Sequence, residues 1–189
     1  MAEFNVSHKS MFDAELDMLV NLVNCKGVTK NSLSAQFSKR FPRSQENYVA
    51  MTEREIMVPD ATGKKRKQKA FQPGDVLHYV DMDVTKVQKF QSETEDMESE
   101  DLQNFINEGV QNVVYMPIRN HWKRPAKLDY FKRGLKSLRQ VLDNEEMPDK
   151  VKTIGLPLPS NELDEDELWK LTENILGDLD YKFTIFPLE

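Results

Sequence analysis

The side chains that could do chemistry gather in three segments that each follow a short apolar run: residues 24–32, 118–128 and 156–163. In sheets with parallel strands, ligands bind at the carboxyl ends of the strands, where loops lead into helices. The second segment contains His121 and Trp122, an aromatic pair that could stack on a base or a nucleotide, or pack within the loop, which is the commoner role. These segments are therefore the first place to look for a binding site.

Asn24 and Cys25 end the first apolar run. An Asn at the end of a strand commonly forms a turn through its side-chain amide and less often binds a ligand. Cys25 is interpreted as a small buried hydrophobic residue, since nothing near it in the sequence except Lys26 could lower the pKa of its thiol. One cysteine and three histidines argue against a disulfide framework and a structural zinc site, so we expect no metal and no cofactor.

A sheet with helices on both faces would position these segments. Residues 18–24 are almost continuously apolar, which is typical of a strand buried on both faces. The apolar residues of 131–142 recur at helical spacing, and Gly177 is placed to cap the last helix. Strands that alternate with helices predict the α/β class. The expected strands are 18–24, 75–80, 110–118, 151–156 and 181–185, and the expected helices are 32–41, 45–56, 102–107, 131–142 and 163–176.

The composition favours one soluble domain. The chain has 189 residues, and it contains no apolar stretch of the roughly 18 residues that a membrane helix needs. Its first residues lack the apolar run of a signal peptide, so we expect a cytoplasmic protein without a membrane partner. The formal net charge of −6 argues weakly against general nucleic-acid binding, but it hides how the charges are distributed.

The charges are in fact segregated along the chain. Residues 64–69 contain five basic residues in six, residues 92–101 contain six acids, and residues 119–127 form a second basic cluster. The first basic segment is either a solvated hairpin tip or a finger that contacts phosphates or an acidic protein face. The acidic segment is interpreted as a solvated loop that could also mimic phosphate or bind a basic partner.

Taken in order, the motifs resemble a macrodomain, the ADP-ribose-binding α/β module. The stretches MFDAELDMLVNLVNCKGV and SAQFSKRFP are similar to the opening of that family, and IGLP and FTIFP resemble two of its later strands. PIRNHWKRP is similar to a segment of the antitoxin branch, typified by the macrodomain of the DarT–DarG system, which removes ADP-ribose from DNA bases. The resemblance implies a three-layer α/β/α mixed sheet in a single domain over residues 1–189, with a basic insertion near 57–72 and an acidic insertion near 91–108.

Four positions depart from the family pattern. Ser10 stands where the resemblance implies an Asp that binds adenine, and Arg119 stands where it implies a nucleophilic Lys. A guanidinium, with a pKa above about 12, keeps its proton and cannot attack an anomeric carbon as a neutral lysine does. The glycines of both phosphate loops are missing: the first loop falls at 29–33, and the second is replaced by a shorter, acid-containing segment at 159–162. Asn24, which the resemblance implicates in binding the distal ribose, is retained.

The resemblance and the charge pattern together select two sets of contact residues. The expected ligand contacts are Asn24, Asn31, Ser32, Arg119, His121, Trp122, Ser160 and Asn161, and the expected partner contacts are Lys64, Lys65, Arg66, Lys67 and Lys69.

We expect a non-catalytic, macrodomain-like inhibitor that antagonises a DarT-like DNA ADP-ribosyltransferase toxin by binding the toxin or its ADP-ribosylated DNA, as a phage counter-defence factor would. ADP-ribose itself is a further candidate ligand. One alternative is an active glycohydrolase that removes ADP-ribose from DNA with electrostatic help from Arg119 and Lys123. The other is an accessory nucleic-acid-binding protein that uses residues 64–69 together with Lys123, Arg124 and Lys127.

Overall fold

The computed structural model describes residues 1–30, 32–93, 109–144 and 151–188. Most of the acidic segment expected near 91–108, and the short helix expected at 102–107, lie outside the described residues. In the described ranges, no helix is both long enough and apolar enough to cross a membrane.

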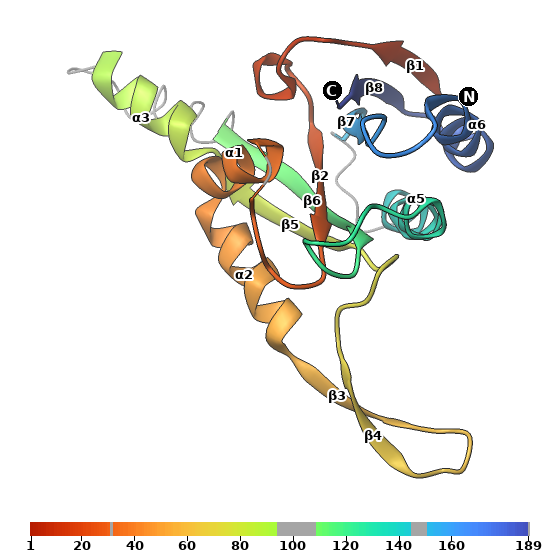
Figure 1. Ribbon diagram of the computed structural model, residues 1–189. Helices are drawn as coiled ribbons and strands as arrows, with labels where there is room; N and C mark the ends of the chain where they lie inside the picture. The colour runs from red at the N-terminus through yellow and green to blue at the C-terminus, as the bar shows by residue number, and fades with distance from the viewer. Residues whose placement is uncertain (31, 94–108, 145–150, 189) are drawn as a thin grey trace.

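Within the described residues, six strands form one sheet in the order β1-β8-β7-β2-β6-β5 (Figure 1). Strand β5 runs antiparallel to β6, and the other neighbouring strands pair in parallel. The strands are β1 (Glu3–Val6), β2 (Met18–Asn24), β5 (Leu77–Met82), β6 (Val110–Arg119), β7 (Thr153–Leu158) and β8 (Lys182–Pro187). The expected mixed α/β sheet is confirmed.

Helices cover both faces of this sheet. On one side lie α1 (Ser32–Arg40), α2 (Pro42–Glu53) and α3 (Val84–Glu93), and on the other lie α5 (Leu128–Leu142) and α6 (Glu165–Leu176) (Figure 1). A short 3-10 helix, η1 (Met11–Asp13), follows β1. One buried apolar cluster joins the sheet to α5 and α6, and a second joins it to η1, α1 and α2. The three-layer α/β/α arrangement is therefore confirmed.

Strand β2 lies in the middle of the sheet, and every one of its seven residues is buried. Val20 and Leu22 belong to the cluster under α5 and α6. Leu19 and Val23 belong to the cluster on the opposite face, because successive side chains of a strand point to opposite sides. Burial on both faces explains why this strand is apolar at nearly every position.

Pro42 follows α1, as expected, and is also the first residue of α2. Proline suits the first helical position because its ring fixes a helical φ and its missing N–H would have no partner there. The helix expected at 45–56 therefore begins earlier, and residues 55–59 form a strand instead. Asp81 of β5 caps α2, since its carboxylate accepts a hydrogen bond from the N–H of Ser44 (2.7 Å).

Helix α3 is absent from the sequence-based expectation, which assigned no helix to residues 84–93. Asp83 caps its first turn by accepting a hydrogen bond from the N–H of Thr85 (2.9 Å). The other carboxylate oxygen of Asp83 forms an ion pair with Arg40 at the end of α1 (3.1 Å). An aspartate that immediately precedes a helical segment is a known N-cap signal, and it could have indicated this helix.

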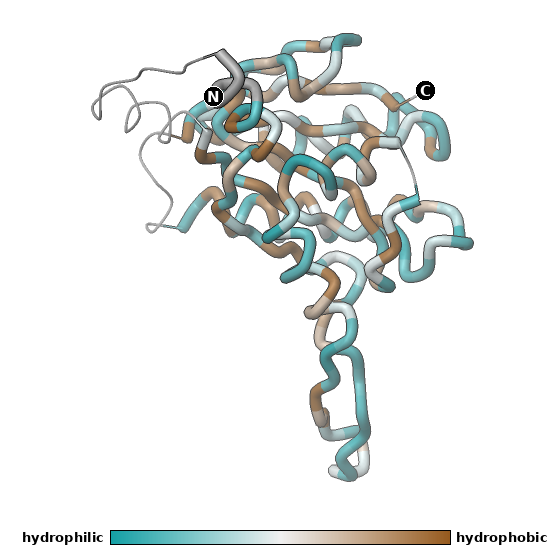
Figure 2. Tube along the Cα trace, turned by 90° about the vertical axis from the view of Figure 1, so that its left-hand side faces the viewer, coloured by the Kyte–Doolittle hydropathy of each residue, from teal (hydrophilic) through white to brown (hydrophobic). Residues whose placement is uncertain are grey.

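Strands β3 (Glu55–Pro59) and β4 (Lys65–Lys69) form a separate antiparallel hairpin, which we call the arm (residues 55–69). Figures 1 and 2 show that the arm extends away from the rest of the molecule. The basic segment 64–69 is mostly the strand β4 rather than the hairpin tip, which is formed by residues 60–63. Gly63 has a φ of +80°, a left-handed conformation that glycine adopts without steric cost.

Asn21 offers a test of this packing. Its side chain is completely buried in β2, and within the described residues neither its amide nitrogen nor its amide oxygen has a hydrogen-bond partner. Because a buried polar group without a partner is costly, we predict that Asn21→Leu stabilises the fold by about 1 kcal/mol in urea unfolding.

The matched control is Asn24→Leu, the same substitution three residues later in the same strand. The Asn24 amide donates a hydrogen bond to the carbonyl of Val28 (2.6 Å), so its loss should lower the free energy of unfolding. Destabilisation of similar size in both variants would contradict the prediction.

Candidate functional site

The three segments selected from the sequence meet at the carboxyl ends of β2, β6 and β7. The N–H of Cys25, after β2, donates a hydrogen bond to the carbonyl of Arg119 at the end of β6 (3.2 Å). Glu162, after β7, contacts both Arg119 and the backbone of Ala126. We call the surface where the described residues of these loops converge the crevice (residues 24–30, 32, 118–128 and 156–163).

Arg119 and Glu162 form an ion pair across the crevice. One carboxylate oxygen of Glu162 accepts a hydrogen bond from an Nη of Arg119, and the other accepts one from the N–H of Ala126 (2.9 Å). The two side chains are 20% and 26% exposed, so solvent screens their attraction only in part. The sequence indicated a negative charge in this loop, but it did not indicate that the charge pairs with Arg119.

Asn24 uses its side chain to shape its own loop. Its amide oxygen accepts a hydrogen bond from the N–H of Lys26 (2.9 Å), and its amide nitrogen donates one to the carbonyl of Val28. The backbone carbonyl of Asn24 accepts a hydrogen bond from the buried hydroxyl of Tyr48 (2.5 Å). The turn-forming role considered for Asn24 is therefore observed, and a ligand would have to compete with these contacts.

Gly27 allows this loop to pack closely on α2. It has a φ of +68°, and a Cβ atom at this position would lie 2.9 Å from the hydroxyl of Thr52. The first crevice loop therefore lies directly against the C-terminal part of α2. Because the arm begins two residues after α2 ends, the arm leaves the body beside the crevice.

Trp122 is half-buried and surrounded by cationic side chains. The Nζ atoms of Lys30 and Lys123 lie 3.9 Å and 4.9 Å from its ring centroid, distances at which cation–π attraction operates. The ring of His121 stacks on it at 5.8 Å between centroids, and the His121 Nδ1 accepts a hydrogen bond from the N–H of Lys123 (3.1 Å). The aromatic pair is thus packed within its loop, and it also brings Lys30 to the second loop.

Of the remaining expected ligand contacts, Ser32, Ser160 and Asn161 lie in the described residues. Asn31 is outside the described residues, Ser32 begins α1, and Asn161 is exposed. The hydroxyl of Ser160 donates a hydrogen bond to the carbonyl of Leu188 (3.0 Å) and so holds the third loop against the chain that follows β8.

A cavity of about 240 Å³ opens between η1, the start of α1 and the ends of β7 and β8. Ser10, Ser32, Gln36 and Leu188 are among the residues that line it. The Ser10 hydroxyl accepts a hydrogen bond from the N–H of Phe12 (3.3 Å) and caps η1. Ser10 thus has a local structural role at the edge of the cavity.

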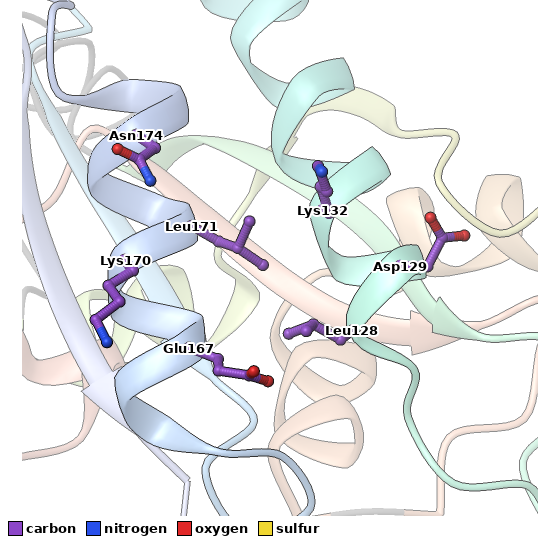
Figure 3. A pocket seen from close by; sticks show the side chains of 7 residues that line it. All are labelled: Leu128, Asp129, Lys132, Glu167, Lys170, Leu171 and Asn174. Atoms are coloured by element: carbon purple, nitrogen blue, oxygen red, sulfur yellow. The ribbon is translucent and has the colours of Figure 1, made fainter.

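A second hollow, of about 430 Å³, lies between α5 and α6 (Figure 3). Leu128 and Leu171 point into it, and it is also lined by Asp129, Lys132 and Glu167. Its charged side chains are of both signs and lie on exposed faces of α5 and α6. Unlike the crevice, it is formed by two helices and not by converging loops.

Cys25 does not have the properties of a nucleophile. It is 2% exposed, and burial raises the pKa of its thiol to about 12, with a smaller contribution from the charge of Asp75. In the described ranges, no three His, Cys, Asp or Glu side chains lie close enough together to hold a metal ion. The interpretation of Cys25 as a small buried residue is confirmed.

The buried thiol leads to a prediction about alkaline pH. An unfolded chain ionises its thiol near pH 9 while the folded chain keeps the proton, so the stability that Cys25 contributes is lost as the pH rises above about 9. Native protein should also react with an aromatic disulfide reagent at least about a hundredfold more slowly than urea-unfolded protein.

The control for the pH effect is Cys25→Ala, which should show no loss between pH 9 and 10. It should still lose stability above pH 10, because burial also raises the pKa values of Tyr48 and Tyr115 above their ordinary value. Rapid labelling of the native thiol would show that this side chain is accessible.

No family model matches the chain. It is similar, however, to two curated proteins and to several solved structures. It is 26% identical over 129 residues to a protein named DNA ADP-ribosyl glycohydrolase from Mycobacterium tuberculosis, and equally to that of Mycobacterium bovis. The alignment covers 68% of this chain and 26% of each relative. The chain thus spans about a quarter of the length of these curated relatives.

The solved structures extend the similarity over nearly the whole chain. The macrodomain of Mycobacterium tuberculosis DarG superimposes with a TM-score of 0.69 at 19% identity, covering 100% of both chains. The macrodomain of Thermus aquaticus DarG gives 0.64 at 20% identity, covering 98% of this chain and 99% of that one. Thermosipho africanus DarTG in complex with ADP-ribose gives 0.66 at 16% identity, covering 98% of this chain and 42% of that one. The chain therefore has the macrodomain fold and resembles macrodomains of the DarG type.

Proposed function

We propose that this protein is an ADP-ribose-related macrodomain that binds without cleaving, and that it antagonises a DarT-like DNA ADP-ribosyltransferase. Its target is the toxin or the ADP-ribosylated DNA that the toxin makes. Support comes from relatives that are named DNA ADP-ribosyl glycohydrolases and from the similarity to a DarTG structure with ADP-ribose. The observation that carries the non-catalytic part of the proposal is the ion pair between Arg119 and Glu162.

The ion pair removes the group that would have to react. Arg119 stands where the resemblance places a nucleophilic lysine, and a guanidinium keeps its proton at any physiological pH. Glu162 pairs with that guanidinium through one carboxylate oxygen and uses its second oxygen on the backbone of Ala126. Neither side chain is left as a free base or nucleophile. Hydrolysis by the reaction that the resemblance implies would therefore lack its nucleophile.

Three further side chains of the crevice do not replace the missing lysine. Lys123 is exposed, lies four residues further along, and has its Nζ over the ring of Trp122. Cys25 is buried with a raised pKa, and the Asn24 amide is engaged in its own loop. These contacts favour a site that can hold an anionic ligand but not transfer it.

The proposed binding role relies on the basic residues of the crevice and on the cavity beside Ser10. Residues 24–32 and 118–128 contain six basic residues and no acid, so an anion meets positive charge on two of the three loops. The cavity beside Ser10 lies at the position where the resemblance places adenine, and it adjoins the third loop through Leu188. Within this proposal the protein acts in the bacterial cytoplasm, as a phage counter-defence factor against such a toxin.

The direct test uses an oligonucleotide that a DarT-like enzyme has ADP-ribosylated. Purified protein in excess should release no free ADP-ribose over several hours, as followed by chromatography. The protein should nevertheless either retard the modified oligonucleotide more strongly than the unmodified one or co-purify with the transferase. Release of ADP-ribose that disappears in Lys123→Ala would favour the glycohydrolase alternative, and the absence of all binding would remove the proposal.

A second prediction concerns the ion pair itself. Glu162→Gln keeps an oxygen for the N–H of Ala126 but removes the negative charge and releases Arg119 toward a pyrophosphate. Calorimetric titration with ADP-ribose should show binding about tenfold tighter than that of the wild-type protein. The matched control is Glu167→Gln on α6, an exposed acid outside the crevice, which should leave the affinity unchanged.

Arg119→Lys completes this set, because it restores the family's residue beside an intact Glu162. The carboxylate should keep the new ammonium group protonated, so this variant should still release no ADP-ribose. Activity gained by Arg119→Lys alone would show that Glu162 does not suppress the nucleophile.

A further inference from the structure

The arm carries a concentration of positive charge on an acidic protein. Its 15 residues contain five basic side chains and two acids, whereas the whole chain has a net charge of −6. Figures 1 and 2 show that both strands of the arm project into solvent, away from the helical layers. The arm therefore presents a surface unlike the average surface of the molecule.

Both acids of the arm are already engaged. One oxygen of Asp60 accepts hydrogen bonds from the N–H groups of Thr62 (2.8 Å) and Lys64 (3.0 Å), which closes the tip. Glu55, at the base, lies between Lys67 (3.7 Å) and Lys69 (3.5 Å).

The distal basic residues are left without an acidic partner. Among the residues that the structure describes, no ion pair involves Lys64, Lys65 or Arg66, and all three are exposed. Their charges are therefore available to an anionic partner.

The hairpin holds its basic side chains at a regular spacing. Lys65, Lys67 and Lys69 alternate along β4 and so lie on one face of the ribbon, about 6.8 Å apart. A two-stranded ribbon of this kind fits the major groove of DNA.

The apolar residues of β3 support the basic strand. Met57 pairs with Lys67 and Val58 pairs with Arg66, so each apolar side chain lies opposite a long basic one on the same face. The methylene groups of lysine and arginine commonly cover apolar surface while the charge stays in water. These apolar residues thus favour conformations in which the charged groups of the lysine and arginine side chains of β4 point into water.

The chemistry of the arm favours nucleic acid over an acidic protein surface. Protein–protein interfaces are enriched in aromatic residues and depleted in lysine. The arm contains four lysines and no aromatic residue. It also leaves the body beside the crevice, whose first two loops add six basic residues. The arm and the two crevice loops thus each contain a cluster of basic residues.

We propose that the arm binds the phosphate backbone of DNA and holds it beside the crevice. This inference rests on the proposed function, because it selects ADP-ribosylated DNA rather than the toxin as the target that the protein engages. The arm supplies affinity that is independent of sequence and of modification, and the crevice supplies the preference for the ADP-ribosyl group.

The test measures fluorescence anisotropy of an unmodified DNA duplex and of its single strand, from 50 to 200 mM salt. The wild-type protein should bind, with affinity falling steeply as salt rises. The triple variant Lys64→Gln, Lys65→Gln, Arg66→Gln should bind about tenfold or more weakly at 50 mM salt. Its slope of log affinity against log salt on the duplex should be smaller by about 2.7 for three lost phosphate contacts.

The matched control removes the same charge elsewhere. Lys132→Gln, Lys136→Gln and Lys170→Gln change three exposed lysines of α5 and α6 and should leave the salt slope unchanged. Circular dichroism should show an intact fold in both triple variants. The charge reversal Lys64→Glu, Lys65→Glu, Arg66→Glu should abolish binding of unmodified DNA.

The outcomes separate this inference from the proposed function. Equal salt slopes for the wild type and the arm variant, or binding of the transferase that is lost in the arm variant while DNA binding is not, would overturn the arm's role in DNA binding. If unmodified DNA binds through the arm but the ADP-ribosylated oligonucleotide binds no more tightly, the role of the crevice fails and the role of the arm stands.

Discussion

The ion pair between Arg119 and Glu162 is the interaction on which the arrangement of the crevice depends. It joins the loop after β6 to the loop after β7, and the second oxygen of Glu162 fastens the same junction to the backbone of Ala126. Arg119 and Glu162 carry opposite charges at this junction, so each is the counter-charge of the other. The contact that joins these loops is therefore also the contact on which the proposed non-catalytic function rests.

Local patterns in the sequence were sufficient for the main elements of the fold. The apolar run at 18–24 predicted a strand buried on both faces, and β2 has these bounds. Gly177 was expected to cap the last helix, and it does so with a right-handed φ of −67° rather than a left-handed one. A Cβ atom there would lie 2.5 Å from the carbonyl oxygen of Glu173, so close approach, rather than positive φ, accounts for the glycine.

Helix α3 was missed although Asp83 is a local signal for its start, but other features that the sequence did not predict depend on contacts between distant residues. Helix α2 begins at Pro42, a residue that suits a first helical position, but its start is capped by Asp81, 37 residues away from Ser44. The pairing of Arg119 with Glu162 likewise joins residues that are 43 positions apart. Residue types and their spacing thus predicted which loops form the crevice. The contacts made by its side chains, including the hydrogen bonds of the Asn24 amide, could be identified only from the structure.

The burial of Cys25 has a practical consequence for studying this protein in solution. It is the one cysteine in the sequence, and it is buried in the apolar cluster that joins the sheet to η1, α1 and α2. A new cysteine placed on an exposed residue would therefore be the preferred site for a maleimide dye, with the native residue left in place. Distances from the tip of the arm to the body could then be followed by single-molecule fluorescence without first removing a core side chain.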